Sequence, residues 1–382
     1  MKVLYDHQAF LKHYSGVSKS FCELISHLPS DIDPFIAVKE SRNLHLIDSG
    51  LVPELKTDGV DVTEIRKRIH IKGVAKAYLI LNRLGLLHKS EYINLKYAID
   101  NLNGQQFDLF HPTFFNQYFL KYLGQKPFVL TIHDMMPELY PQYYGKNDMQ
   151  IIAKKELVKK AGHIIAVSEN TKKDIVNILG VSPERITVIY HGGPKPYCNK
   201  GQRLYDFQYF LYVGSRSGYK NFGTMLDAFG AFHEKHKEVR LVCTGPSFDA
   251  SERNIMSQKK LTDFVIHRYV NDEELQILYS GAIAFIYPSL YEGFGMPILE
   301  AFAAQCPVIL SNASCFPEIA GNAALFFDTN NGVDDLEAKL STVYDWNEEE
   351  RNNAINRGLT RLSSFSWQDS AALLANVYKK VV

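Results

Sequence analysis

The chain has 382 residues, of which 46% are hydrophobic and 22% are charged, and its Lys plus Arg count equals its Asp plus Glu count at 42. This length favours two domains, and the composition is that of an ordinary globular protein. The balanced charge argues against a nucleic-acid binder held by bulk electrostatics. Five scattered cysteines without a C-x-x-C pair argue against a disulfide framework or a zinc site.

Targeting signals are not expected from the sequence. Asp6 and His7 interrupt the apolar run that a signal peptide would need near the N-terminus. No uncharged run reaches the about 20 apolar residues that cross a bilayer. Together with the cysteine usage, these features predict a cytoplasmic protein.

Short apolar runs alternate with helical patterns along the chain, which is typical of α/β architecture with parallel sheets. Ser168 is the predicted N-cap of the helix that follows the run HIIAVS. The predicted strands are KVLYD, PFIAV, FDLFH, FVLTIH, HIIAVS and ITVIYH in the first half, then FLYVG, VRLVCTG, FVIHRYV, AFIYPS and PVILS in the second.

Glycine, proline and polar residues dominate at 192–207, which is the predicted interdomain linker. It separates a predicted N-terminal domain, 1–191, from a C-terminal domain, 208–365. Ligands of open parallel sheets bind beyond the carboxyl ends of the strands. Two such domains therefore predict a cleft lined by strand ends.

The run YEGFGMPILE follows a predicted strand and opens a helix, with Pro297 expected at the first helical position. Gly293 and Gly295 allow the backbone to approach a ligand and to present N–H groups to a phosphate or hydroxyl. Glu300, expected in the opening turn, is placed to accept hydrogen bonds from a ribose diol, and Glu292 to face the other end of the ligand. The alternative is a glutamate that is favoured in a first turn by the helix dipole.

Three further stretches place polar residues at strand ends. In VGSRSGYKNF, Arg216 and Lys220 could stabilise a departing diphosphate, or they could be two solvated loop residues. In FVLTIHD, His133 could bind substrate hydroxyls or be a structural histidine. In KHYSGVSKSF, the exposed N–H groups at Gly16 could approach a phosphate.

Together these stretches resemble the retaining glycosyltransferases of family 4, whose GT-B fold has two facing Rossmann-like domains. Glu292 and Glu300 match the E-x7-E pair of that family. The final run, FSWQDSAALLANVYKK at about 366–382, resembles the helix that crosses back to the first domain. The other matching stretches are HYSGVSKSF, TIHD, YVGSRSGYKN and NDEELQILYSGAIAFIYPSLYEGFGMPILEAFAAQCPVILSN.

The resemblance implies roles for individual residues. Arg216 and Lys220 would hold the donor diphosphate, and Glu300 would hold the ribose. Glu292 and His133 would contact the transferred sugar. The remaining implied donor contacts are Gly16 at the diphosphate, Phe294, Gly295 and Met296 in the loop at the sugar and phosphate, and Tyr269 and Val270 at the base.

The resemblance also implies an activity. A hexose would move, with retention of configuration, from GDP-mannose or a UDP-sugar to a saccharide or lipid-linked saccharide acceptor. Assembly of a bacterial surface polysaccharide such as the O-antigen of lipopolysaccharide is the implied setting. No metal and no nucleic-acid partner are expected, and an inactive nucleotide-sugar-binding scaffold of the same fold is the alternative.

Rival enzyme classes lack their motifs. The D-x-D run Asp31-Ile32-Asp33, which a metal-dependent GT-A transferase would need, precedes a proline and reads as a solvated turn. A dinucleotide-dependent oxidoreductase would need G-x-G-x-x-G after a strand, which the sequence lacks.

The stretch 66–89, RKRIHIKGVAKAYLILNRLGLLHK, has basic residues and no acid, interleaved with apolar residues. Such a stretch could bind anionic lipid at the inner face of the cell membrane, or it could be a solvated helix face over a local core.

Overall fold

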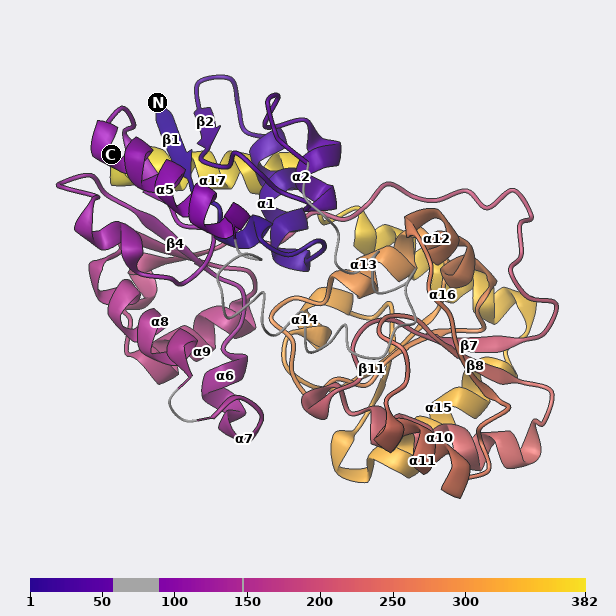
Figure 1. Cartoon of the computed structure of the whole chain (residues 1–382). Coiled ribbons are helices and arrows are strands. Elements are labelled where there is room, and N and C mark those ends of the chain that lie inside the picture. Colours follow the sequence, from indigo (N-terminus) through magenta and orange to yellow (C-terminus); the bar gives the residue numbers. More distant parts are fainter. Residues whose placement is uncertain (58–88, 146–147) are drawn as a thin grey trace, which may run out of the picture.

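The computed structural model describes residues 1–57, 89–145 and 148–382. The basic stretch at 66–89 therefore falls almost wholly outside the described residues. The described chain forms two α/β domains, drawn in indigo to magenta and in pink to yellow in Figure 1. The predicted α/β class with parallel sheets is confirmed.

The first domain contains two three-stranded parallel sheets with the orders β2-β1-β3 and β4-β5-β6, and a bridge between Phe110 and Phe128 links them. Its strands are β1 (Lys2–Tyr5), β2 (Asp33–Ile36), β3 (Leu109–His111), β4 (Val129–Ile132), β5 (His163–Ala166) and β6 (Ile186–Val188). Its helices are α1 (Gly16–Ser26), α2 (Leu44–Ser49), α5 (Lys89–Gly104), α6 (Met136–Leu139), α7 (Pro141–Tyr144), α8 (Met149–Lys160) and α9 (Glu169–Leu179).

The second domain contains one six-stranded parallel sheet with the order β12-β11-β10-β7-β8-β9. Its strands are β7 (Tyr209–Tyr212), β8 (Arg240–Cys243), β9 (Val265–His267), β10 (Phe285–Tyr287), β11 (Val308–Ser311) and β12 (Leu325–Phe327). Its helices are α10 (Phe222–Lys235), α11 (Ala250–Gln258), α12 (Asp272–Gly281), α13 (Met296–Ala303), α14 (Phe316–Ala320), α15 (Gly332–Tyr344) and α16 (Glu348–Leu362).

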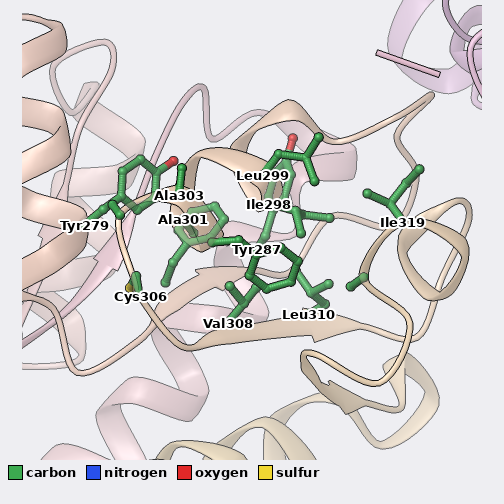
Figure 2. Packing of buried hydrophobic residues seen from close by; sticks show 14 of the residues in the cluster. Tyr279, Tyr287, Ile298, Leu299, Ala301, Ala303, Cys306, Val308, Leu310 and Ile319 are labelled. Atoms are coloured by element: carbon green, nitrogen blue, oxygen red, sulfur yellow. The ribbon is translucent and has the colours of Figure 1, made fainter. Parts of the chain in front are cut away.

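The central strands are continuous apolar runs because helices cover both faces of each sheet. All residues of β4, β5, β7, β10 and β11 are buried. Figure 2 shows one such interface, where Ile298 of α13 lies on the side of Tyr287 of β10 and of Val308 and Leu310 of β11, all within one buried cluster. This packing holds α13 against the strands beside it.

All the predicted strands appear. Most are shorter than predicted by one to four residues, whereas β2 and β7 each begin one residue earlier than predicted, and Ser168 caps α9 as predicted. The predicted strands do not include β12, which lies at the edge of the second sheet and has only Phe327 fully buried.

The chain crosses between the domains at two adjacent places. A Cβ on Gly192 would lie 2.4 Å from the Trp367 backbone nitrogen, and one on Gly193 would lie 2.3 Å from Leu362. The outgoing chain therefore runs directly against the returning chain. The returning helix, α17 (Trp367–Val381), packs in the core of the first domain, where it is the yellow helix among indigo elements (Figure 1).

Strand order in the second sheet places two loops together. After β7 the chain builds β8 and β9 on one side, then returns to place β10 on the other side of β7. The loops that follow β7 and β10 therefore leave the sheet side by side, at the switch point where open α/β sheets bind their ligands.

Candidate active site

The loops after β7 and β10 bring Lys220 and Glu292 together. The Lys220 ammonium donates to the Glu292 carboxylate over 2.5 Å, and it also lies 3.5 Å from the Tyr287 hydroxyl. The two charged side chains are only 12% and 15% exposed. The pair lies at the switch point of the sheet, which is where open α/β sheets bind their ligands.

Gly293 brings this loop against the first domain. A Cβ at this position would lie 1.7 Å from the carbonyl oxygen of His133, so only glycine allows the observed approach. The Gly293 carbonyl also accepts a hydrogen bond of 3.3 Å from the Thr171 hydroxyl. The structure therefore places His133 beside the loop that carries Glu292.

The imidazole of His133 is neutral in the folded protein at neutral pH. Its ring stacks on His191 at 6.0 Å between centroids and meets the edge of Phe21 at 5.8 Å. Burial lowers the pKa of His133 to about 4, and Asp134 offsets only part of this effect. Its buried Nε2 atom has no hydrogen-bond partner in the described part of the chain. A neutral imidazole with an unsatisfied nitrogen can bind a ligand hydroxyl.

Two details of α13 differ from the prediction. The helix begins at Met296, so Pro297 occupies its second position and Glu300 its fifth, one residue beyond the first turn. In this structure the Glu300 carboxylate accepts a hydrogen bond of 2.8 Å from the Lys19 ammonium of α1. Gly295 caps α13 with a left-handed φ of 91°, a conformation that favours glycine.

Lys19 is a site residue that sequence reasoning missed. It lies in the first turn of α1, three residues after Gly16. Gly16 begins that helix. Among the residues that the structure describes, no atom other than those of its chain neighbours and its own helix lies within 4 Å of where its Cβ would be. The sequence offered one indication of this role, because Lys19 lies close to the turn at Gly16 that was already expected to face a phosphate.

Arg216 is engaged away from Lys220. Its guanidinium pairs with Glu252 over 2.7 and 3.3 Å, and it also donates to the carbonyl oxygens of Thr244 and Pro246. The Phe248 ring lies 4.7 Å from the guanidinium carbon. The structure thus surrounds Arg216 with protein partners, and the diphosphate contact remains a prediction.

The loop after β11 forms hydrogen bonds with the backbone of the loop that carries Glu292, called the glutamate loop below. Sequence reasoning did not predict this role of the loop after β11. The Ser314 hydroxyl donates to the Glu292 carbonyl at 2.6 Å, and the Cys315 thiol contacts the carbonyls of Glu292 and Phe294. These bonds fix the direction in which Glu292 leaves the chain.

The remaining predicted contacts are spread over the cleft. Phe294 is buried with its ring edge-on to His191 at 4.8 Å, and Met296 packs against apolar clusters of both domains. Val270 packs against the core of the second domain, whereas Tyr269 is 68% exposed and contacts His267.

Residues 1–57, 89–145 and 148–382 contain no group of three or more His, Cys, Asp or Glu side chains arranged to hold a metal. Within the same residues, no helix is both long and apolar enough to cross a membrane.

Comparison with known proteins identifies the family. Residues 14–192 match the model described as Glycosyltransferase Family 4, and residues 199–361 match that of Glycosyl transferases group 1. Over 278 residues the chain is 30% identical to O-antigen chain mannosyltransferase B of Escherichia coli, covering 66% of this chain and 70% of the relative. The chain is a glycosyltransferase of these families.

A second relative of this glycosyltransferase is O-antigen chain mannosyltransferase RfbU of Salmonella typhimurium, 29% identical over 65% of this chain and 68% of that one. Among solved structures, Anabaena Alr3699/HepE in complex with UDP-glucose superposes with a TM-score of 0.71 at 14% identity and covers 100% of both chains. This likeness confirms the GT-B fold predicted for the glycosyltransferase. The roles of individual site residues stay predictions.

Proposed function

We propose that this glycosyltransferase transfers mannose from GDP-mannose, with retention of configuration, to a saccharide or lipid-linked saccharide acceptor of a bacterial surface polysaccharide such as the O-antigen. The observation that carries the proposal is the close approach of the His133 backbone to Gly293, the residue that follows Glu292 of the Lys220–Glu292 pair. The relatives named above support mannose over other hexoses. A UDP-sugar is the alternative donor.

In the proposed reaction, Lys220 changes its ion-pair partner from Glu292 to the donor diphosphate. When a donor arrives, Lys220 can turn from Glu292 to the diphosphate and stabilise the negative charge that develops on the leaving group. Glu292, released from Lys220, accepts hydrogen bonds from the sugar hydroxyls. His133 binds the same sugar from the opposite wall, and because it is neutral it competes with neither charge.

Retention is proposed without a covalent enzyme intermediate. A double displacement needs one carboxylate as nucleophile and a second as acid and base. In the proposed roles Glu300 binds the ribose and Glu292 binds the sugar hydroxyls, so neither acid is assigned as the nucleophile or as the acid and base. Departure and attack on the same face of the sugar need neither group, because the leaving diphosphate can itself accept the proton of the acceptor hydroxyl.

The two glutamates separate the proposal into testable parts. Glu300→Ala should weaken GDP as well as GDP-mannose by roughly ten- to a hundred-fold, because both carry the ribose that it binds. Glu292→Ala should leave GDP binding unchanged or tighter, since Lys220 is released, while mannosyl transfer falls. His133→Ala should leave GDP binding unchanged and should reduce transfer. Titration calorimetry and product formation measure both effects, with Glu349→Ala on the exposed start of α16 as control.

An inactive scaffold of the same fold would bind GDP-mannose without product. The assignment of the acids is wrong if Glu292→Ala loses GDP binding and Glu300→Ala keeps it.

A set of GDP- and UDP-sugars, compared by protection against thermal unfolding, selects the donor because selective binding raises the unfolding temperature.

Metal independence is part of the proposal. Lys220 and the helix N-termini at the cleft would meet the diphosphate charge without a cation. Transfer should survive a chelator, and Lys220→Ala should abolish most of it. Complete loss in chelator, restored by manganese, would contradict this account.

Peripheral membrane contact through 66–89 is proposed from the sequence alone, as a route to a lipid-linked acceptor. Binding to anionic vesicles should fall as salt rises, because the lysines and arginines act through charge. Equal binding to neutral vesicles, or no binding, would reject it.

A further inference from the structure

We propose that Lys19, which the first domain contributes across the cleft, is a diphosphate-binding cation that leaves Glu300 when the nucleotide arrives. The inference deepens the proposed function and rests on it. It concerns a residue of the opposite domain from Arg216 and Lys220.

The position of Lys19 supports this role. It lies in the first turn of α1, whose N-cap is Ser15, and the backbone N–H groups of such a turn favour an anion. The Lys19 ammonium lies 2.8 Å from the Glu300 carboxylate of α13, and their side chains are 25% and 18% exposed. The pair therefore joins the two domains at the acid proposed to hold the ribose.

The charge of the ligand requires such a group. A diphosphate brings at least two negative charges into a cleft that is largely withdrawn from water, where unpaired charge is costly. Lys220 supplies one cation. Arg216 is held by a carboxylate, two carbonyl oxygens and aromatic rings, so it would have to abandon several partners to reach a ligand.

Lys19 can exchange its partner at less cost. Its ammonium carries three N–H donors on a flexible stem, and the bond to Glu300 uses one of them. Burial is the largest single influence on the pKa of Lys19 and lowers it, but Glu300, Tyr14 and Asp272 together raise it further, and the net shift is upward. The ammonium is therefore charged when the nucleotide enters. Tyr14, Asp272 and His45 are the other polar groups whose charges act within this cluster.

Ribose binding favours the exchange. If Glu300 accepts hydrogen bonds from the ribose hydroxyls, its electron density is shared and its hold on Lys19 weakens. The ammonium then gains a stronger partner in the diphosphate, which carries at least two negative charges and offers more acceptor oxygens than the carboxylate. A purely structural pair would instead keep Lys19 on Glu300 throughout.

The test compares ligands with and without phosphate. Guanosine and GDP are titrated into wild type, Lys19→Met and Lys19→Arg by calorimetry, with Lys159→Met on the exposed face of α8 as the charge-matched control. We expect Lys19→Met to weaken GDP by roughly ten- to a hundred-fold while guanosine binds equally or more tightly, because Glu300 is released for the ribose. Lys19→Arg should retain most GDP affinity, and Lys159→Met should match wild type.

Two outcomes overturn the inference. Equal loss of guanosine and GDP in Lys19→Met shows that Lys19 only positions Glu300, and unchanged GDP affinity shows that it does not meet the phosphates. In both cases wild type still binds GDP, so the proposed function survives. Failure of wild type to bind GDP or UDP rejects the proposed function itself, and the inference with it. Circular dichroism and the unfolding temperature confirm that each variant is folded.

Discussion

Gly293 touches the first domain so closely that a larger residue does not fit. The two glycines of the loop are required for different reasons. Gly295 has a left-handed φ, whereas Gly293 leaves room for the carbonyl oxygen of His133. That oxygen belongs to the backbone, so it cannot rotate away as a flexible side chain would.

Gly293→Ala should therefore displace the glutamate loop from His133. A misplacement of about 1 Å can reduce turnover roughly a hundred-fold, and we expect a loss of this size in mannosyl transfer together with a lower unfolding temperature. The control is Gly230→Ala within α10, where the new Cβ would lie 3.5 Å from Leu261, an ordinary contact. It should keep full turnover. Wild-type activity in Gly293→Ala would show that the close approach is dispensable.

At the scale of elements, the N-terminus of α9 is held by the other domain. Its first two backbone N–H groups, of Glu169 and Asn170, donate to the Glu318 carboxylate of α14 at 2.6 and 3.0 Å. The third, of Thr171, donates to the Ser168 side chain. In addition, the Tyr291 hydroxyl donates to Asp174 at 2.6 Å. Helix α9 is therefore capped from both domains. Moving the domains apart would break the hydrogen bonds to Glu318 and leave the bond to Ser168.

Glu318→Ala should loosen this contact. Hydrogen bonds to a charged group contribute about 1.5–3 kcal/mol, so the amides of Glu169 and Asn170 should exchange hydrogen faster, while that of Thr171, capped by Ser168, changes less. Glu318→Gln should be intermediate because it keeps an acceptor without the charge. Hydrogen-exchange mass spectrometry of α9 measures the effect, with Glu349→Ala as control. Unchanged exchange in Glu318→Ala would show that the domains do not depend on this cap.

At the scale of the whole molecule, buried polar contacts tie the last helix to the first strands. The Tyr378 hydroxyl of α17 lies 2.7 Å from that of Tyr5 and 2.6 Å from Nδ1 of His111. Burial lowers the pKa of His111 to about 3, and it acts in the same direction on His133 and His191. All three histidines are therefore neutral in the folded protein at neutral pH.

Stability should consequently fall as the pH drops from about 6.5 toward 4. In that window the unfolded chain binds protons on these histidines and the folded chain does not, so protonation favours unfolding. Each histidine contributes a slope of up to about 1.4 kcal/mol per pH unit. Calorimetric unfolding temperatures between pH 7.5 and 5 test this. His111→Gln should flatten the dependence, and His13→Gln, at an exposed position, should not.

The sequence by itself determined what depends on neighbours along the chain. Apolar runs and helical patterns predicted the alternation of strands and helices, and Ser168 was recognised as a cap because capping involves residues a few positions apart. The run from Glu292 to Glu300 pointed to the family and to its fold. Strand β12 was not predicted, and it differs from the buried central strands in lying at the sheet edge with only Phe327 fully buried.

Only the tertiary structure decided which side chains meet. Lys220 pairs with Glu292 because the sheet places β10 beside β7, although β8 and β9 lie between them in the sequence. Arg216 pairs with Glu252, and Lys19 of the first domain pairs with Glu300 of the second. Such pairs join residues far apart in the chain, and strand order and domain closure select them. Local sequence patterns contain neither strand order nor domain closure. Arg216, Lys220, Glu292 and Glu300 were therefore predicted from the sequence, whereas Lys19, Glu252 and the pairing of all these charges were not.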